Sequence, residues 1–220
     1  SGTYIQGSSE TNIKSYGHGM FQSIYDYPYL SSSANHIFDV TMGYSNNSSL
    51  SASANSQQSK KINIYNQMAQ VLMGFDHTGS VHEFDEDGDL SGGTKIREAF
   101  FINFARLLTK DEIKKGSFAL TLGVSGAYDN FGAFNQRVQL ADTDANTDFK
   151  VNSPAGEYAI LYATNAAGTE LVNQTGGAKA IKAGLLYYQA GVAVVTASIF
   201  ESRGGGALLS GSGGPAFPLF

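Results

Sequence analysis

The chain has 220 residues and an acidic balance, with 14 Lys and Arg against 19 Asp and Glu, a net charge of −5 and a sequence pI of about 5.3. This charge excludes a basic field that could neutralise phosphates or anionic lipid heads, so we expect neither nucleic acid nor a membrane surface as a partner. The absence of cysteine excludes a disulfide framework, and the charged fraction of 15%, well under the roughly 25% of soluble domains, indicates burial of surface in an assembly.

Residues 1–35 have the composition of an N-terminal arm, because polar and aromatic residues follow one another without a clear period. Pro28 disfavours a helical conformation at the preceding Tyr27. We therefore expect an irregular, extended arm with one short strand. The chain shows no secretory signal and no run of roughly 18 apolar residues, so no segment is expected to cross a bilayer.

A β-rich domain is expected over residues 36–202. It opens with a strand at 36–44, where alternation places Phe38, Val40 and Met42 on one face. The following loop, 45–59, carries no charge and a single large apolar side chain. This composition predicts a flexible loop, or alternatively an extended connector that becomes ordered only against another subunit.

The hydrophobic period then changes to that of a helix. Apolar residues recur at spacings of three and four, which predicts an amphipathic helix over about 59–74, with Ser59 able to cap its start and Gly74 its end. The helix is expected to dock on a sheet through one stripe, made of Ile64, Met68, Val71, Leu72 and Phe75.

The second half of the chain has the patterns of antiparallel strands. Thr109 and Glu112 have capping-box spacing, which predicts a short helical turn at about 110–115. The elements add up to a mainly β fold: a β-sandwich or barrel-like domain with one amphipathic helix, one short helical turn and extended terminal arms. Strands are expected at 99–108, 117–124 and 157–163, and a hairpin at 184–199.

The densest acidic cluster lies in a polar loop, where Asp85, Asp87 and Asp89 alternate with other residues. Three carboxylates at this spacing can converge on a hard cation such as calcium. Counting from Asp85, however, the Gly and the bidentate Glu of a helix–loop–helix calcium site are replaced by Leu90 and Ile96. The pattern therefore favours a solvated acidic turn, with a metal site and a salt contact to another subunit as weaker alternatives.

The chain lacks the residue spacings of common catalytic sites. No complete nucleophile, phosphate-loop or zinc pattern is present, so we expect neither an enzyme nor a cofactor. Two other classes stay open. A hydrolase would have to use the Asp85 to Asp89 carboxylates. A receptor- or glycan-binding β domain would stack sugars on exposed aromatic rings, for which the candidates are Tyr158, Tyr162, Tyr187 and Tyr188.

Residues 203–220 have the composition of a Gly-rich C-terminal assembly arm. Glycine and serine make a flexible tether, and the apolar residues at its end would be liabilities unless they dock. We expect them to form a subunit interface in a neighbouring copy, with folding back on the same chain and disorder as alternatives. The expected interface residues are Phe217, Pro218, Leu219 and Phe220.

Five segments carry a resemblance to known proteins: 12–20, 25–29, 60–70, 104–118 and 184–196. Together they resemble virion structural proteins of contractile-tailed bacteriophages, particularly those of marine bacteria. The resemblance touches about half of the chain and assigns no functional residue. It implies a non-enzymatic building block of a tail, baseplate or neck, assembled in the host cytoplasm with copies of itself and other virion proteins.

Overall fold

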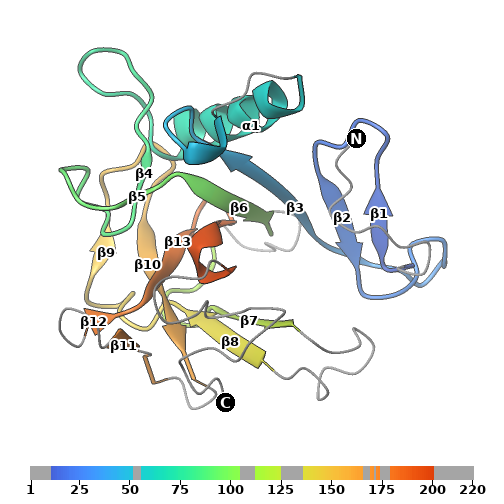
Figure 1. The fold of residues 1–220 in the computed structure, drawn as a ribbon. Coiled ribbons are helices and arrows are strands. Elements are labelled where there is room, and N and C mark those ends of the chain that lie inside the picture. The colour runs from blue at the N-terminus through green and yellow to red at the C-terminus, as the bar shows by residue number, and fades with distance from the viewer. Residues whose placement is uncertain are drawn as a thin grey trace.

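The computed structural model describes residues 11–51, 56–104, 112–124, 136–165, 169–170, 172–173 and 179–200. The fold is mainly β, as the sequence predicts, and is built on one open, antiparallel sheet that does not close into a barrel (Figure 1). Along the sheet the strands are β1 (Ile13–Ser15), β2 (Gln22–Tyr25), β3 (His36–Tyr44), β6 (Glu98–Asn103), β14 (Val192–Thr196), β13 (Lys182–Tyr187), β10 (Tyr158–Thr164), β8 (Gln136–Ala141) and β7 (Ala119–Val124), with β9 (Phe149–Lys150) also paired to β10.

Four short strands and three helices complete the described elements. Two small hairpins lie outside the main sheet, and the single α-helix of the described residues lies beside β3. None of the described helices is long and apolar enough to span a membrane. These elements are β4 (Phe84–Asp85) with β5 (Lys95–Ile96), β11 (Val172–Asn173) with β12 (Lys179–Ala180), α1 (Ser56–Leu72), and the 3-10 helices η1 (Ser49–Ser51) and η4 (Ala197–Phe200).

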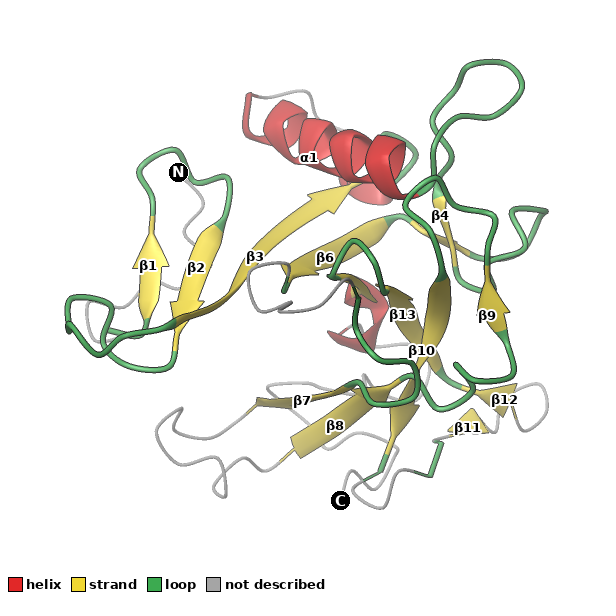
Figure 2. Ribbon diagram, turned by 180° about the vertical axis from the view of Figure 1, so that it is seen from behind, coloured by secondary structure: helices red, strands yellow, loops and turns green. Residues whose placement is uncertain are grey.

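Both faces of the central strands are buried, which gives the molecule its sandwich-like character. In β10 the side chains of Tyr158 and Ile160 join the core under α1, whereas those of Ala159 and Leu161 join a second core on the opposite face. The same alternation runs through β13 and β14. Figures 1 and 2 show α1 on one side of the central strands and β7 and β8, which continue the same sheet, on the other, while the β1–β2 hairpin stands apart from the body.

Three aromatic rings connect β3 to the start of β7 across the second core. The Phe104 ring lies 5.4 Å from that of Phe38 and 5.7 Å from that of Phe118. Phe118 packs with Leu120 and Leu122 against this core, as their alternation predicts, but all three are only partly buried because β7 is an edge strand. The sheet curls, so that its own strands β7 and β8 form the second layer of the sandwich.

Helix α1 is present where the sequence predicts a helix, but its buried face differs from the predicted stripe. Val71 and Phe75 are exposed at 64% and 58%, respectively. Ile64 and Leu72 are buried as the stripe predicts, and Met68 packs partly buried against the same core. Tyr65 and Ala69 complete the inner face of the helix, so Val71 lies outside it, and Phe75 lies beyond the end of α1.

At Gly43 the backbone of β3 approaches the backbone of α1 directly. A Cβ atom at this position would lie 2.8 Å from the carbonyl oxygen of Lys61 and 2.8 Å from the amide nitrogen of Tyr65. Contacts this short are not tolerated between a side chain and the backbone of a helix. Glycine at position 43 therefore sets the distance at which α1 covers the sheet.

Most of the other predicted strands are confirmed, the N-terminal region differs from its prediction, and some predicted segments lie outside the described residues. The strands expected within 36–44, 99–108, 117–124 and 157–163 and the hairpin within 184–199 are present. The N-terminal region contains two strands rather than one, and both extend the main sheet. Some predictions lie wholly or partly outside the described residues: parts of the helical turn at 110–115 and of loop 45–59, and the whole arm 203–220 with Phe217, Pro218, Leu219 and Phe220. Over 112–117, which is described, the chain forms a bend and a turn.

Candidate functional site

The acidic loop connects β4 to β5 and is fixed to the core at its base. Phe84 faces Ile96 and Asp85 faces Lys95 across this hairpin, and the Phe84 and Ile96 side chains are buried in the core under α1. The Tyr65 hydroxyl donates a hydrogen bond to the Ile96 carbonyl oxygen at 2.7 Å. The hairpin is therefore tied to both the helix and the sheet.

The tip of the loop is held by β10 and the segment before it. The carbonyl oxygen of Gly88 accepts hydrogen bonds from the Asn152 side-chain amide at 2.9 Å and from the Tyr158 hydroxyl at 3.1 Å. Gly88 has a φ of 72°, a conformation that favours glycine, and a Cβ there would press on the Tyr158 ring. These contacts fix the turn that brings the three aspartates together.

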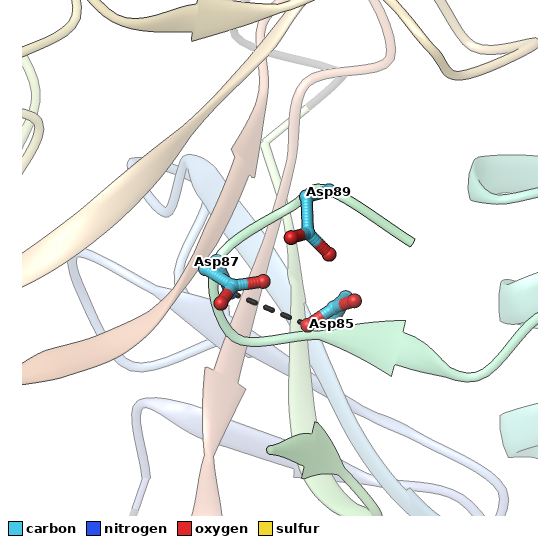
Figure 3. A group of neighbouring side chains, drawn as sticks. All are labelled: Asp85, Asp87 and Asp89. Carbon is cyan, nitrogen blue, oxygen red and sulfur yellow. Dashed lines mark hydrogen bonds between the residues drawn. The ribbon is translucent and has the colours of Figure 1, made fainter. Parts of the chain in front are cut away.

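The three carboxyl groups converge, as the sequence spacing suggests (Figure 3). One oxygen from each of Asp85, Asp87 and Asp89 lies within 4.8 Å of the others. The Asp85 side chain is fully buried, so the prediction of a solvated turn is wrong for this residue; Asp89 is exposed. The burial comes from the packing of β4 under α1, a contact that local sequence does not contain.

Two lysines offset much of the negative charge. The Lys95 Nζ lies 2.5 Å from Asp85 Oδ2, and the Lys182 Nζ lies 3.9 Å from Asp87 Oδ2. Each ammonium group reduces the attraction that the carboxylates would exert on a divalent cation. The arrangement is closer to a partly buried ion-pair network than to a calcium site.

The pKa values of the two inner carboxyl groups move in opposite directions. Burial raises the pKa of Asp85, although the hydrogen bond from Lys95 opposes the change. Burial also acts to raise the pKa of Asp87, but the hydrogen bond with Asp85 and the charge of Lys182 outweigh it and hold this pKa below its usual value. The two groups therefore interact directly, and Asp85 is protonated more readily than Asp87.

The neighbouring polar residues do not converge on a second centre. The Asp76 carboxylate accepts hydrogen bonds from the backbone of Thr78 and Ser80, and these contacts close its own turn. Glu83 instead bonds to Ser45 and Asn47. The Asp76 carboxylate stabilises its own turn, and the Glu83 carboxylate joins its loop to the segment after β3.

A Ser–Asp–His set on the β2–β3 hairpin is not visible as a motif in the sequence. Ser23 faces Asp39 across the strands, and Asp39 Oδ1 lies 2.5 Å from the Ser23 hydroxyl and 2.7 Å from His36 Nε2. Because both partners bond to the same carboxylate oxygen, the histidine does not accept the serine proton, as a nucleophilic triad requires. The set holds the hairpin together.

The tyrosines proposed for sugar stacking lie in the core. Tyr158, Tyr187 and Tyr188 are fully buried and Tyr162 is 8% exposed, so no ring of this group offers a face to a glycan. Exposed aromatic side chains lie elsewhere: Tyr27 in the turn between β2 and β3 is 60% exposed, and Phe75 after α1 is 58% exposed. Sequence alternation does not distinguish buried from exposed tyrosines, because the tyrosine side chain is found both in cores and at surfaces.

Comparison with protein-family models, with curated proteins and with solved structures finds no match to this chain.

Proposed function

We propose that the chain is a non-enzymatic structural subunit of a contractile-tailed phage virion, in the tail or baseplate, where it contacts copies of itself and other virion proteins. Two kinds of support lead here. The sequence resemblance supplies the class of particle. The structure adds exposed apolar side chains on a hairpin that projects from the β body (Figure 2).

The observation that carries the proposal is the aromatic tip of the β2–β3 hairpin. Tyr27 and Leu30 expose 60% and 87% of their surface on a turn that stands away from the body (Figure 2). Large exposed apolar side chains on a projecting element are typical of contact sites with other proteins. We define residues 26–30 as the hairpin tip.

The hairpin tip is presented on an ordered support. The Asp26 carboxylate accepts hydrogen bonds from the backbone amide and the side-chain amide of Asn35, at 2.7 and 2.9 Å. The Tyr29 amide donates to the Thr11 carbonyl oxygen at 2.9 Å. A surface held in this way loses little conformational entropy on binding, which favours assembly.

The chemistry of the acidic loop also supports a structural role. The Asp85 and Asp87 carboxylates are engaged by Lys95 and Lys182, and the loop backbone is fixed by Asn152. A hydrolase of this kind places both carboxyl groups beside the bound substrate, whereas the Asp85 side chain is fully buried. The observed pairing serves the fold better than such a reaction.

A particle-incorporation assay with matched variants tests the proposal. The Tyr27→Ser/Leu30→Ser double variant should keep the wild-type melting temperature, because both side chains are exposed, but should be lost from purified particles. Val151→Ser, at another apolar side chain that is 69% exposed, is the control and should be incorporated normally. Truncation after Arg203 tests the C-terminal arm in the same assay and should also abolish incorporation.

Normal incorporation of both the double variant and the truncated chain would contradict the assembly proposal. A glycan array run with the same proteins addresses the receptor-binding alternative. Binding to a glycan that is lost in the double variant, together with normal incorporation, would favour that alternative.

A further inference from the structure

We propose that Lys95 and Asp85 become joined by an intramolecular isopeptide bond, with Asp87 transferring the protons. This inference concerns a modification site and does not depend on the proposed function. It rests on the placement of an amine, a buried carboxyl group and a second carboxyl group at the base of the β4–β5 hairpin.

The two reacting side chains are held face to face. Lys95 and Asp85 are direct partners in the β4–β5 register, and Lys95 Nζ lies 2.5 Å from Asp85 Oδ2. The hairpin is fixed by Tyr65 on one side and by Tyr158 at its tip. Reactants held in this way behave as if present at very high local concentration, which favours a reaction that is slow between free molecules.

The site keeps water away from the carboxyl group. The Asp85 side chain is fully buried and the Lys95 side chain is 21% exposed. Removal of water disfavours a separated ammonium and carboxylate relative to the neutral amine and acid. The neutral amine is the nucleophilic form of lysine.

Asp87 is placed to move protons between the two. One of its carboxylate oxygens lies within 4.8 Å of an Asp85 oxygen, and its backbone amide donates to Asp85 Oδ1 at 3.4 Å (Figure 3). Its Oδ1 atom is buried and has no hydrogen-bond partner among the described residues. Asp87 pairs with Lys182 rather than with Lys95, but its free oxygen lies close to the Asp85 carboxyl group, where addition of the amine brings the N–H protons within reach of a general base.

The bond changes balance without a further reactant. Lys95 first transfers one proton to Asp85, which gives a neutral amine and a neutral acid. The amine nitrogen then attacks Asp85 Cγ and forms the C–N bond while Asp87 takes a second proton from the nitrogen. Asp87 returns this proton to the departing hydroxyl group, the C–O bond breaks and one water molecule leaves. An ammonium and a carboxylate become an amide, so the net charge is unchanged, and the hairpin is closed covalently at its base.

Intact mass spectrometry of the purified full chain tests the proposal. The wild-type protein should be lighter than its sequence mass by one water molecule, and a digest should contain a branched peptide that joins Lys95 to Asp85. Lys95→Arg, which keeps the positive charge, and Asp87→Asn should both have their full sequence mass. Asp85→Asn should lose ammonia in place of water, because an amide nitrogen is then the leaving group.

Two outcomes would overturn the proposal. A wild-type mass equal to the sequence mass after prolonged incubation would show that the pair is ionic only. Loss of water with a linear digest would indicate a succinimide at Asp87–Gly88 instead; that product is cleaved by hydroxylamine and persists in Lys95→Arg, whereas the isopeptide bond resists hydroxylamine and needs Lys95. The wild-type mass and digest decide the matter even if a variant fails to fold.

Discussion

Replacement of Gly43 by alanine should destabilise the protein through a single methyl group. The new Cβ would lie 2.8 Å from Lys61 O and Tyr65 N and 3.1 Å from Tyr65 Cα, all of them backbone atoms of α1. The helix must move outward to relieve these contacts, which loosens the packing of buried residues such as Leu72. Overpacking of this kind costs about 1–3 kcal/mol.

A smaller effect acts in the opposite direction. Alanine restricts the unfolded chain more than glycine does, which stabilises the folded state by about 0.4–1 kcal/mol where the backbone angles allow it. Subtraction of the middle of one range from the middle of the other leaves an expected net loss of about 1 kcal/mol in the free energy of unfolding. Urea denaturation should show this loss as a lower midpoint with an unchanged slope.

Gly17→Ala provides the matched control. A Cβ at Gly17 would meet no atom within 4 Å, so only the unfolded-state effect applies and stability should be unchanged or slightly higher. If Gly43→Ala is as stable as Gly17→Ala, the close approach of α1 to β3 is wrong, and with it the reason for a glycine at this position.

Three further predictions follow from buried or charged groups. Asp142→Ala should cost about 3 kcal/mol or more in urea denaturation, because the amides of Gly116 and Phe118 and the Tyr188 hydroxyl lose their buried acceptor; a loss under about 1 kcal/mol would contradict this network. Calorimetric titration with calcium should show no binding tighter than about millimolar, since Lys95 and Lys182 offset the acidic loop, and a micromolar constant would refute that conclusion. Burial raises the pKa of Tyr158 and of Tyr162 to about 12 from the usual 10.0, so the folded state holds these protons more tightly than the unfolded state does. The free energy of unfolding should be constant below pH 10 and should fall between about pH 10 and 12, by up to about 1.4 kcal/mol per pH unit for each tyrosine. Equal urea midpoints at about pH 9 and pH 11 would contradict the burial of these rings.

The sequence predicts the central strands well because their signal is local. The apolar run ending at Ala163 and the alternation after Phe118 both reflect side chains that point to opposite faces of a strand. Strands β1 and β2 are harder to predict, since they are three and four residues long and include the polar Gln22 and Ser23. Their strand structure depends on backbone pairing, of β2 with β3 and of β1 with β2.

The candidate site is only half predictable for a similar reason. The spacing of Asp85, Asp87 and Asp89 is visible in the sequence, and their convergence follows from a tight turn. The burial of Asp85 and the approach of Lys182 depend on contacts between segments far apart in the chain. Local patterns contain no information on such contacts, so the sequence alone favours a solvated turn.

Quantitative mass spectrometry of purified particles tests the proposed function most directly. Particles from a host that carries the gene in a contractile-tailed phage genome should contain this chain in multiple copies, at a fixed ratio to the other tail proteins. Exclusive recovery of the chain in the unassembled fraction, with none in intact particles, would contradict the proposal.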